Sequence, residues 1–158
     1  MLKSFEREAR RRGIPVSHLI NQTLRTYITR DKYFEELGFL PLSKDLIRKV
    51  LSRIEEKYLI EDAKEFGLTL MKEYISYFFV DVNTNTLLEF LDLWLSRFAY
   101  RHRIDYKQHS YCVNHDLGMS YSIFFREYIK ALIERIINSP VRFSATGPST
   151  LTFSFETS

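Results

Sequence analysis

Residues 141–155, VRFSATGPSTLTFSF, carry the clearest strand signal in the chain. Apolar and polar side chains alternate on both sides of a TGPS segment, as expected for two strands that each bury one face. The Gly-Pro pair between the two runs is typical of a turn. The stretch therefore predicts a β-hairpin, with strands at 141–146 and 150–156. The side chains expected on its buried face are Val141, Phe143, Ala145, Leu151, Phe153 and Phe155.

The segment before this hairpin adds a further strand signal and a helix. Residues 103–116, RIDYKQHSYCVNHD, mix Tyr, Val and Ile with polar side chains, which is typical of a strand or a hairpin. Gly118 and Ser120 then precede a helical pattern that runs to about Asn138. We therefore expect an α+β fold, in which two or three C-terminal helices pack on a small antiparallel sheet.

The N-terminal part of the chain is predicted to be mostly helical, because its apolar side chains recur at helical spacing. The predicted helical segments span residues 2–12, 18–37, 44–79, with Gly67 as a possible break, and 87–99. The residues expected to cap a helix start are Ser17, Ser43 and Thr86, the last within a T-L-L-E capping box. The glycines expected to end or break a helix are Gly13, Gly38 and Gly67.

The composition indicates a globular protein. The chain has 158 residues, of which 45% are hydrophobic and 27% charged, and a disordered chain has fewer apolar residues and a higher net charge. A single cysteine, Cys112, excludes an intramolecular disulfide framework. No apolar run approaches the roughly 20 residues of a membrane span, and no signal peptide is visible. These observations predict a cytoplasmic protein without a membrane partner.

Basic residues are concentrated near the N-terminus. Residues 1–30 hold seven Lys and Arg against two Glu, a charge of +5, whereas residues 31–158 carry a charge of −2. The net charge of +3 is too small to indicate a partner by itself. Its uneven distribution favours a nucleic-acid-binding surface in the first 30 residues.

The basic segment also has a recognisable order of residues. EREARRRGIPVSHLINQTLRTYI, residues 6–28, places Glu8-Ala9 before Gly13-Ile14, then Ser17, Leu19-Ile20-Asn21 and Tyr27. This order and spacing resemble the two helices of the ribbon-helix-helix family, the CopG/Arc/MetJ-like repressors. In that family, two chains intertwine as a dimer, and a two-stranded ribbon reads base edges in the major groove of DNA.

The resemblance implies a homodimer and a set of DNA-contacting residues. The N-terminus of the second helix grips a phosphate in that family through backbone N–H groups. The residues that would bind DNA here are Lys3, Arg11, Arg12, Val16, Ser17 and His18. Two interpretations of Arg10, Arg11 and Arg12 stay open: they contact phosphates, or they only stabilise the C-terminal turn of the first helix.

One feature of the family pattern is not met. The ribbon strand precedes the first helix in the family, whereas here the first predicted helix follows Met1 almost at once. The resemblance therefore implies the helices and a dimer more strongly than sequence-specific DNA binding.

Two groups of residues could carry chemistry in the C-terminal part. His109, Cys112 and His115 have the residue types of a metal site. On a strand, however, Cys112 would point away from the two histidines. We therefore expect no metal, no cofactor and no catalytic residues, and we expect Cys112 to be a small buried side chain.

The connection from this strand to the last long helix is a second candidate. His115, Tyr121 and Ser122 could be the polar points of a small-molecule pocket between helix and sheet. The alternative is an ordinary connection between a strand and a helix.

The sequence thus predicts three parts and a regulatory role. Residues 1–38 are expected to form a ribbon-helix-helix-like dimerisation and DNA-binding module, residues 39–65 a helical connector, and residues 66–158 an α+β sensor or interaction domain. The predicted function is that of a dimeric transcription-regulator-like protein, not an enzyme, with DNA and a small ligand or protein as partners. The alternative is an interaction or assembly protein that does not bind DNA.

Overall fold

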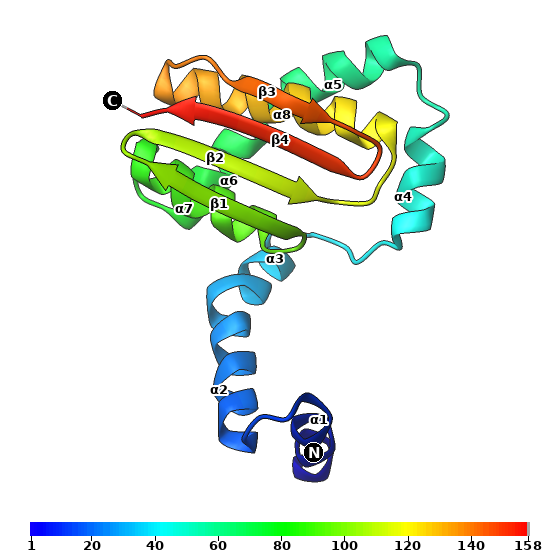
Figure 1. The fold of residues 1–158 in the computed structure, drawn as a ribbon, viewed down its shortest axis with the longest axis vertical. Helices are drawn as coiled ribbons and strands as arrows, with labels where there is room; N and C mark the ends of the chain where they lie inside the picture. Colours follow the sequence, from blue (N-terminus) through cyan, green and yellow to red (C-terminus); the bar gives the residue numbers. More distant parts are fainter. Residues whose placement is uncertain (158) are drawn as a thin grey trace. The chain divides into compact units, whose positions relative to one another are not determined.

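The computed structural model describes residues 1–157, except for the side chain of Met71, and divides the chain into two compact units (Figure 1). Unit 1 spans Met1–Pro41, and unit 2 begins at Leu42. The fold is α+β, as predicted, with all the strands in unit 2.

Unit 1 is made of helices. They are α1 (Leu2–Arg12), α2 (Val16–Thr26), the π-helical turn η1 (Tyr27–Asp31) and α3 (Lys32–Glu36). Gly13 ends α1 in the left-handed region at φ 66°, and Gly38 follows α3 at φ 74°, so both predicted helix ends are confirmed. The second predicted helix is continuous from Val16 to Glu36, with one π turn in its middle.

The predicted cap at Ser17 is wrong. Helix α2 begins at Val16, and Pro15 holds the N-cap position with φ −60° and ψ 144°. The proline ring fixes this φ, which makes Pro15 a natural entry to the helix. Ser17 therefore lies inside the first turn, and no side chain caps α2.

Unit 2 contains five helices among the described residues. They are α4 (Lys44–Leu51), α5 (Glu56–Leu68), α6 (Leu70–Phe78), α7 (Thr84–Leu95) and α8 (Met119–Ile137). The predicted cap at Ser43 is confirmed, because its hydroxyl accepts a hydrogen bond from the Leu46 N–H at 3.2 Å. Figure 1 shows α5 to α8 on one side of the sheet.

The prediction that Gly67 breaks a helix is wrong. The break lies at Thr69, between α5 and α6. Gly67 lies inside α5, where this helix packs directly against α8. A Cβ atom at this position would lie 2.5 Å from the carbonyl oxygen of Tyr128. The glycine therefore permits a close approach of two helix backbones.

The start of α7 also differs from the prediction. Asn83, not Thr86, is the N-cap. The Asn83 side chain accepts a hydrogen bond from the Thr86 N–H at 3.1 Å, and the Thr86 hydroxyl accepts one from the Asn83 N–H at 2.9 Å. This reciprocal pair starts the helix two residues before the predicted cap. Helix α7 ends at Leu95, and residues from Ala99 onward belong to a strand instead of the predicted helix end.

The sheet has four antiparallel strands in the order β1-β2-β4-β3. They are β1 (Ala99–Asp105), β2 (Gln108–Asn114), β3 (Arg142–Thr146) and β4 (Thr150–Glu156). The predicted C-terminal hairpin is confirmed. Residues 103–116, predicted as a strand or a hairpin, form most of a hairpin whose first strand begins four residues earlier than expected. The central strands β2 and β4 pair along their whole length, which joins the two hairpins.

The helix-facing side of the sheet forms part of the core of unit 2. Leu151, Phe153 and Phe155 of β4 are buried, and so are alternate residues of β2. Ala145 is exposed, contrary to the prediction, because a bulge between Phe143 and Ala145 shifts the register of β3. The buried side chains on β2 are His109, Tyr111 and Val113.

Cys112 is exposed, so its predicted burial is wrong. The strand alternation that separates Cys112 from His109 also places its thiol on the solvent face. A small apolar side chain in a strand does not by itself reveal which face of the sheet the helices cover.

The boundary between the two units lies at Pro41. The proposed connector, residues 39–65, is therefore not a separate part of the chain: most of it belongs to unit 2, since α5 packs extensively on α8. Among the described residues, no helix combines the length and hydropathy needed to cross a bilayer.

Candidate functional site

Helix α1 carries a row of exposed cations. Lys3, Arg7 and Arg10 recur at spacings of four and three residues and therefore share one side of the helix. Within residues 1–157, none of the three forms an ion pair. We call these three residues the basic row. Phosphate contact by Arg10 was one of two open interpretations, whereas Arg7 was not among the predicted contact residues, although its helical spacing to Lys3 is visible in the sequence.

The predicted contacts Arg11 and Arg12 are engaged by Glu8. Arg11 binds the Glu8 carboxylate with two nitrogens at 2.8 and 2.6 Å, and Nε of Arg12 lies 2.6 Å from Oε1. The guanidinium of Arg11, followed by that of Arg12, lowers the pKa of Glu8 to about 2. The shared carboxylate offsets part of the charge of these two arginines, so the basic row offers the less compensated charge.

The start of α2 has unoccupied backbone donors. Val16, Ser17 and His18 form its first turn, and no side chain accepts a hydrogen bond there. Ser17 and His18 are exposed, and Val16 is half-buried. The first N–H groups of a helix can bind an anion such as a phosphate oxygen, so the predicted contact at this turn is chemically feasible.

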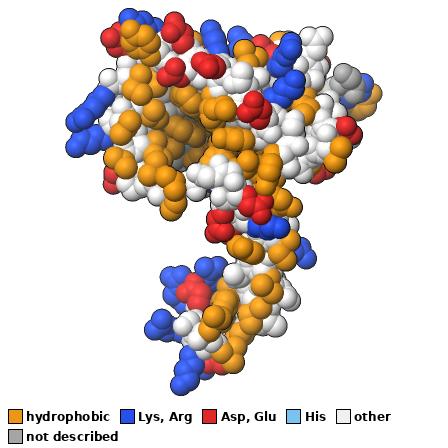
Figure 2. All heavy atoms as spheres, turned by 180° about the vertical axis from the view of Figure 1, so that it is seen from behind, with side chains coloured by type: hydrophobic (Ala, Val, Ile, Leu, Met, Phe, Trp, Pro, Cys, Tyr) orange, Lys and Arg blue, Asp and Glu red, His pale blue; other side chains and the backbone are white. Residues whose placement is uncertain are grey.

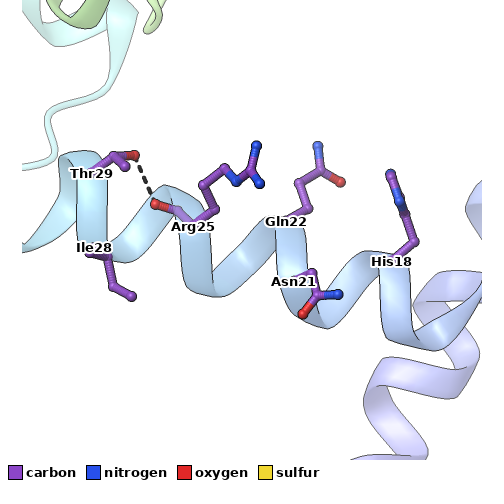
Figure 3. A pocket seen from close by; sticks show the side chains of 6 residues that line it. All are labelled: His18, Asn21, Gln22, Arg25, Ile28 and Thr29. Carbon is purple, nitrogen blue, oxygen red and sulfur yellow. Dashed lines mark hydrogen bonds between the residues drawn. The ribbon is translucent and has the colours of Figure 1, made fainter.

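A polar row runs from this turn along α2 and η1 (Figure 3). His18, Gln22, Arg25 and Thr29 follow one another on one side of the helix, and Asn21 lies beside them on the side that the apolar Ile28 also faces. The Thr29 hydroxyl donates to the Arg25 carbonyl oxygen at 2.8 Å, which keeps it close to the backbone. The prediction included His18 but missed the rest. We call these five residues the polar row.

A third surface of unit 1 is apolar. Leu2 and Ile28 are each 61% exposed, Leu24 is 55% exposed and Tyr27 is 48% exposed. Figure 2 shows hydrophobic side chains running along unit 1, with Lys and Arg side chains to one side of them. We call these four residues the apolar stripe. Buried side chains are few in this unit, namely Ala9, Leu19 and Phe34.

The predicted ligand residues of unit 2 form an internal hydrogen-bonded cluster. His115 is fully buried, its Nδ1 accepts a hydrogen bond from the Leu117 N–H at 3.0 Å, and its Nε2 lies 2.9 Å from the Ser122 hydroxyl. Nε2 therefore carries the proton and donates it to Ser122. The Ser122 hydroxyl in turn donates to the carbonyl oxygen of Gly147.

This cluster ties the end of β2 to the turn between β3 and β4. Burial lowers the pKa of His115 to about 4, so the imidazole is neutral at pH 7. The ring of Tyr121 lies 5.0 Å from that of His115. The structure thus brings the three predicted residues together. The polar side-chain atoms of His115 and Ser122, however, are hydrogen-bonded within the protein. This arrangement resembles a structural connection more than an open ligand pocket.

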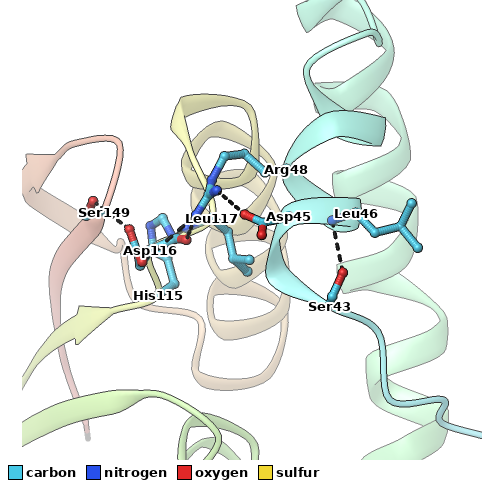
Figure 4. Close-up of polar contacts among 8 residues, drawn as sticks. All are labelled: Ser43, Asp45, Leu46, Arg48, His115, Asp116, Leu117 and Ser149. Atoms are coloured by element: carbon cyan, nitrogen blue, oxygen red, sulfur yellow. Dashed lines mark hydrogen bonds and ion pairs between the residues drawn. The ribbon is translucent and has the colours of Figure 1, made fainter.

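Helix α4 is attached to the same connection (Figure 4). Arg48 donates to the carbonyl oxygen of Asp116 at 2.9 Å and to the Asp45 carboxylate at 2.6 Å. The Ser149 hydroxyl donates to the Asp116 carboxylate at 3.3 Å. Asp116 has a φ of 56°, so its backbone is in the left-handed region. Arg48 binds its carbonyl oxygen, and Ser149 binds its side chain. These contacts are typical of a structural junction.

Unit 2 also has a groove between α5 and α8. Its volume is about 320 Å³, and it carries cations and carboxylates in similar number. The lining side chains are Lys64, Leu68, Glu127, Lys130, Ala131, Glu134 and Arg135. Because the groove carries both signs of charge, its charge indicates neither an anionic nor a cationic ligand. Across the described part of the chain, no group of three or more His, Cys, Asp or Glu is arranged to hold a metal ion.

Comparisons with protein-family models, with curated protein sequences and with solved structures find no match to this chain. The functional argument therefore rests on the surfaces of the two units themselves.

Proposed function

We propose that this protein is a homodimeric, DNA-binding regulator whose unit 1 dimerises and contacts DNA and whose unit 2 binds a ligand or a protein partner. A ribbon-helix-helix-like ancestry of α1 and α2 is part of this proposal. The role is not enzymatic, and a cytoplasmic location fits the single cysteine.

The observation that supports this proposal most directly is the pairing of two surfaces on one small unit. Unit 1 exposes the basic row on α1 and the apolar stripe, which lies mostly on α2 and η1. A dimeric DNA-binding module needs both kinds of surface: an apolar one that buries against a second copy, and a basic one that follows the phosphate backbone.

The apolar stripe supports the dimer. Burying one large apolar side chain contributes about 1.5–3 kcal/mol, so four such side chains on each protomer offer a substantial driving force. Unit 1 has few buried side chains of its own, and a second copy would supply the missing cover.

The basic row supports the contact with DNA. Three uncompensated cations on each protomer give a dimer up to six, in addition to the N-terminal turn of α2. If about four phosphates are neutralised, log K should fall with log salt at a slope of about −3 to −4.

The test measures binding of the full chain to a fluorescent random-sequence duplex by anisotropy, from 50 to 300 mM salt. We expect the wild type to bind with this slope. The double variant Arg7→Ala/Arg10→Ala should bind more weakly and with a shallower slope. The control Arg101→Ala/Arg103→Ala removes two exposed cations from the sheet and should leave the slope unchanged. A wild type that does not bind duplex DNA at 50 mM salt would refute the proposal.

A second candidate function is that of an interaction or assembly protein without DNA binding. It is favoured by helix α4, where none of the apolar residues is buried and Leu46 and Val50 are 48% and 52% exposed. Figure 2 shows hydrophobic side chains gathered in a hollow on the helical side of unit 2. A protein that dimerises but ignores DNA in the same titration would support this alternative.

A further inference from the structure

We infer that the polar row of α2 and η1 reads base edges in the major groove of duplex DNA. This inference rests on the dimer and the DNA contact of the proposed function, not on the ribbon-helix-helix ancestry, because a ribbon and not a helix reads the bases in that family. It goes beyond the proposed function by assigning sequence recognition to a helix face. The residues concerned are His18, Asn21, Gln22, Arg25 and Thr29.

The local geometry suits a helix that enters a groove. Three residues, Gly13 to Pro15, separate α1 from α2, and Gly13 is in the left-handed region. Figure 1 shows α1 nearly end-on while α2 runs along the page, so the two helices cross steeply. A short glycine-containing turn between steeply crossed helices is the arrangement in which a second helix can lie in the major groove.

The length of the row matches a short DNA site. His18 and Thr29 are eleven residues apart, and at 1.5 Å per residue the row extends over roughly 16 Å. Base pairs in B-DNA are stacked about 3.4 Å apart, so the row covers about five of them. Figure 3 shows His18, Gln22, Arg25 and Thr29 along one side of the helix, where they could face consecutive base pairs.

The side-chain types are those that recognise bases. An arginine can donate two hydrogen bonds to guanine O6 and N7, and an asparagine or glutamine can pair with adenine N6 and N7. Arg25, Gln22 and Asn21 are all exposed, and none of these three side chains is hydrogen-bonded within the described residues. Their donors and acceptors are therefore available to a partner.

Charge favours a polyanionic partner over another protein surface. Residues 9–30 contain five arginines and no Asp or Glu. An ordinary solvated helix of the same chain has a different composition: α5 alternates Glu and Asp with Lys along EKYLIEDAKEF. Glu8 binds Arg11 and Arg12, and Asp31 binds Arg30, so Arg10 and Arg25 are the two arginines of this segment without a carboxylate partner among the described residues. No carboxylate lies within the polar row itself to repel the phosphates that flank a groove.

The test begins with the wild-type full chain and a pool of random duplexes, from which bound sequences are selected and sequenced. Affinities for the selected duplex and for a scrambled duplex are then measured at one salt concentration. Asn21→Ala and Gln22→Ala change no charge, so they probe recognition without altering the electrostatic contribution. Each should weaken binding to the selected duplex by about 5- to 150-fold. Each should change binding to the scrambled duplex by less than twofold.

The matched control is Gln108→Ala, an exposed amide on β2 of unit 2, which should change neither affinity. Circular dichroism of each variant establishes that the helices are intact. If the wild type binds duplexes without sequence preference, or if Asn21→Ala and Gln22→Ala keep the full preference, the inference is overturned while the proposed function stands. If the wild type binds no duplex at all, both fail.

Discussion

Nε2 of His102 lies 3.0 Å from Nδ1 of His109, across the pairing between β1 and β2. The other nitrogen of His102 lies 3.4 Å from the Asp92 carboxylate on α7. Only one proton can lie between the two facing nitrogens, so one imidazole donates and the other accepts. The pair therefore connects the first hairpin to α7 through a chain of three titratable groups.

We predict that removing His102 raises the pKa of His109. Burial lowers this pKa first and the neighbouring His102 lowers it further, while Asp92 acts in the opposite direction. In His102→Gln, the second contribution disappears and that of Asp92 remains. The pKa of His109 can be followed by NMR titration of its ring protons. His18→Gln, in unit 1, is the control and should leave it unchanged; a pKa that falls or stays constant in His102→Gln would contradict the assignment.

Acidification is predicted to destabilise unit 2 through His115. Its folded-state pKa is about 4, below the ordinary value of about 6.5 expected in the unfolded chain. The unfolded state therefore takes up the proton first, and the stability contributed by the neutral imidazole is present above pH 7 and lost as the pH falls from about 6.5 towards 4. Between pH 7 and pH 5 the loss should be about 2 kcal/mol, measured by urea unfolding.

Two observations can check this pH dependence independently. His115→Gln should reduce the difference in stability between pH 7 and pH 5 by a similar amount, whereas His18→Gln, which removes an exposed imidazole, should not. If His115→Gln does not fold, the pKa of His115 can be measured in the wild type by NMR titration. Protonation of His115 near pH 6.5 would show that burial does not hold it neutral.

Gly67→Ala is predicted to destabilise unit 2 by about 1–3 kcal/mol. The added methyl group would lie 2.5 Å from the Tyr128 carbonyl oxygen, so α5 and α8 would have to move apart. The matched control is Gly147→Ala, where the nearest atom to the new Cβ lies 3.4 Å away. Thermal unfolding of both variants measures the difference. Equal stability of the two would mean that the α5–α8 contact is more tolerant than its geometry indicates.

The last strand provides a prediction about the core. Phe153 is 1% exposed and its ring stacks on that of Tyr111 at 5.2 Å, so Phe153→Ala should cost roughly 3–5 kcal/mol. Ser154 lies on the opposite face, and Ser154→Ala should change the free energy of unfolding by less than about 0.5 kcal/mol. Denaturant melts of the two variants test the facing of β4. Equally mild effects would place the strand outside the core.

Replacing Leu24 with Asp is predicted to dissociate the dimer. Leu24 belongs to the apolar stripe, and a carboxylate there would have to be buried without a partner in the dimer interface. Light scattering at tens of micromolar should give the mass of a dimer for the wild type and of a monomer for Leu24→Asp. Thr29→Asp places the same charge in the polar row and should remain dimeric. A monomeric wild type would remove the basis for this prediction.

The sequence predicted the elements of this fold better than their ends. Alternation over residues 141–155 identifies the C-terminal hairpin because strand alternation depends only on neighbours in the sequence. The bulge that exposes Ala145 depends on the pairing of β3 with β4, which no local pattern contains. Gly67 was misassigned for a similar reason, since its role comes from a helix sixty residues away.

The sequence shows only part of the arrangement of the candidate site. The sequence located the basic segment, but it did not show that Glu8 binds both Arg11 and Arg12, because a carboxylate at that spacing can equally point to solvent. Of the polar row only His18 was predicted, although the helical spacing that aligns Gln22 with Arg25 is present in the sequence. The residue types identified His115 and Ser122 as polar groups near the end of a strand. The hydrogen bond from Ser122 to Gly147, which lies in a turn distant in the sequence, could not be predicted from local patterns.

The bulge in β3 has a consequence for how copies of the protein can associate. Strands β1 and β3 are the two edges of the sheet, and an unpaired edge can recruit a strand from another molecule. The irregular register at Phe143 and Ala145 interrupts one edge, and Arg101 and Arg103 place positive charge along the other. Both features disfavour edge-to-edge pairing of the sheets of two copies, and so disfavour fibre-like growth through the strands. We therefore expect copies of the protein to associate through their helices.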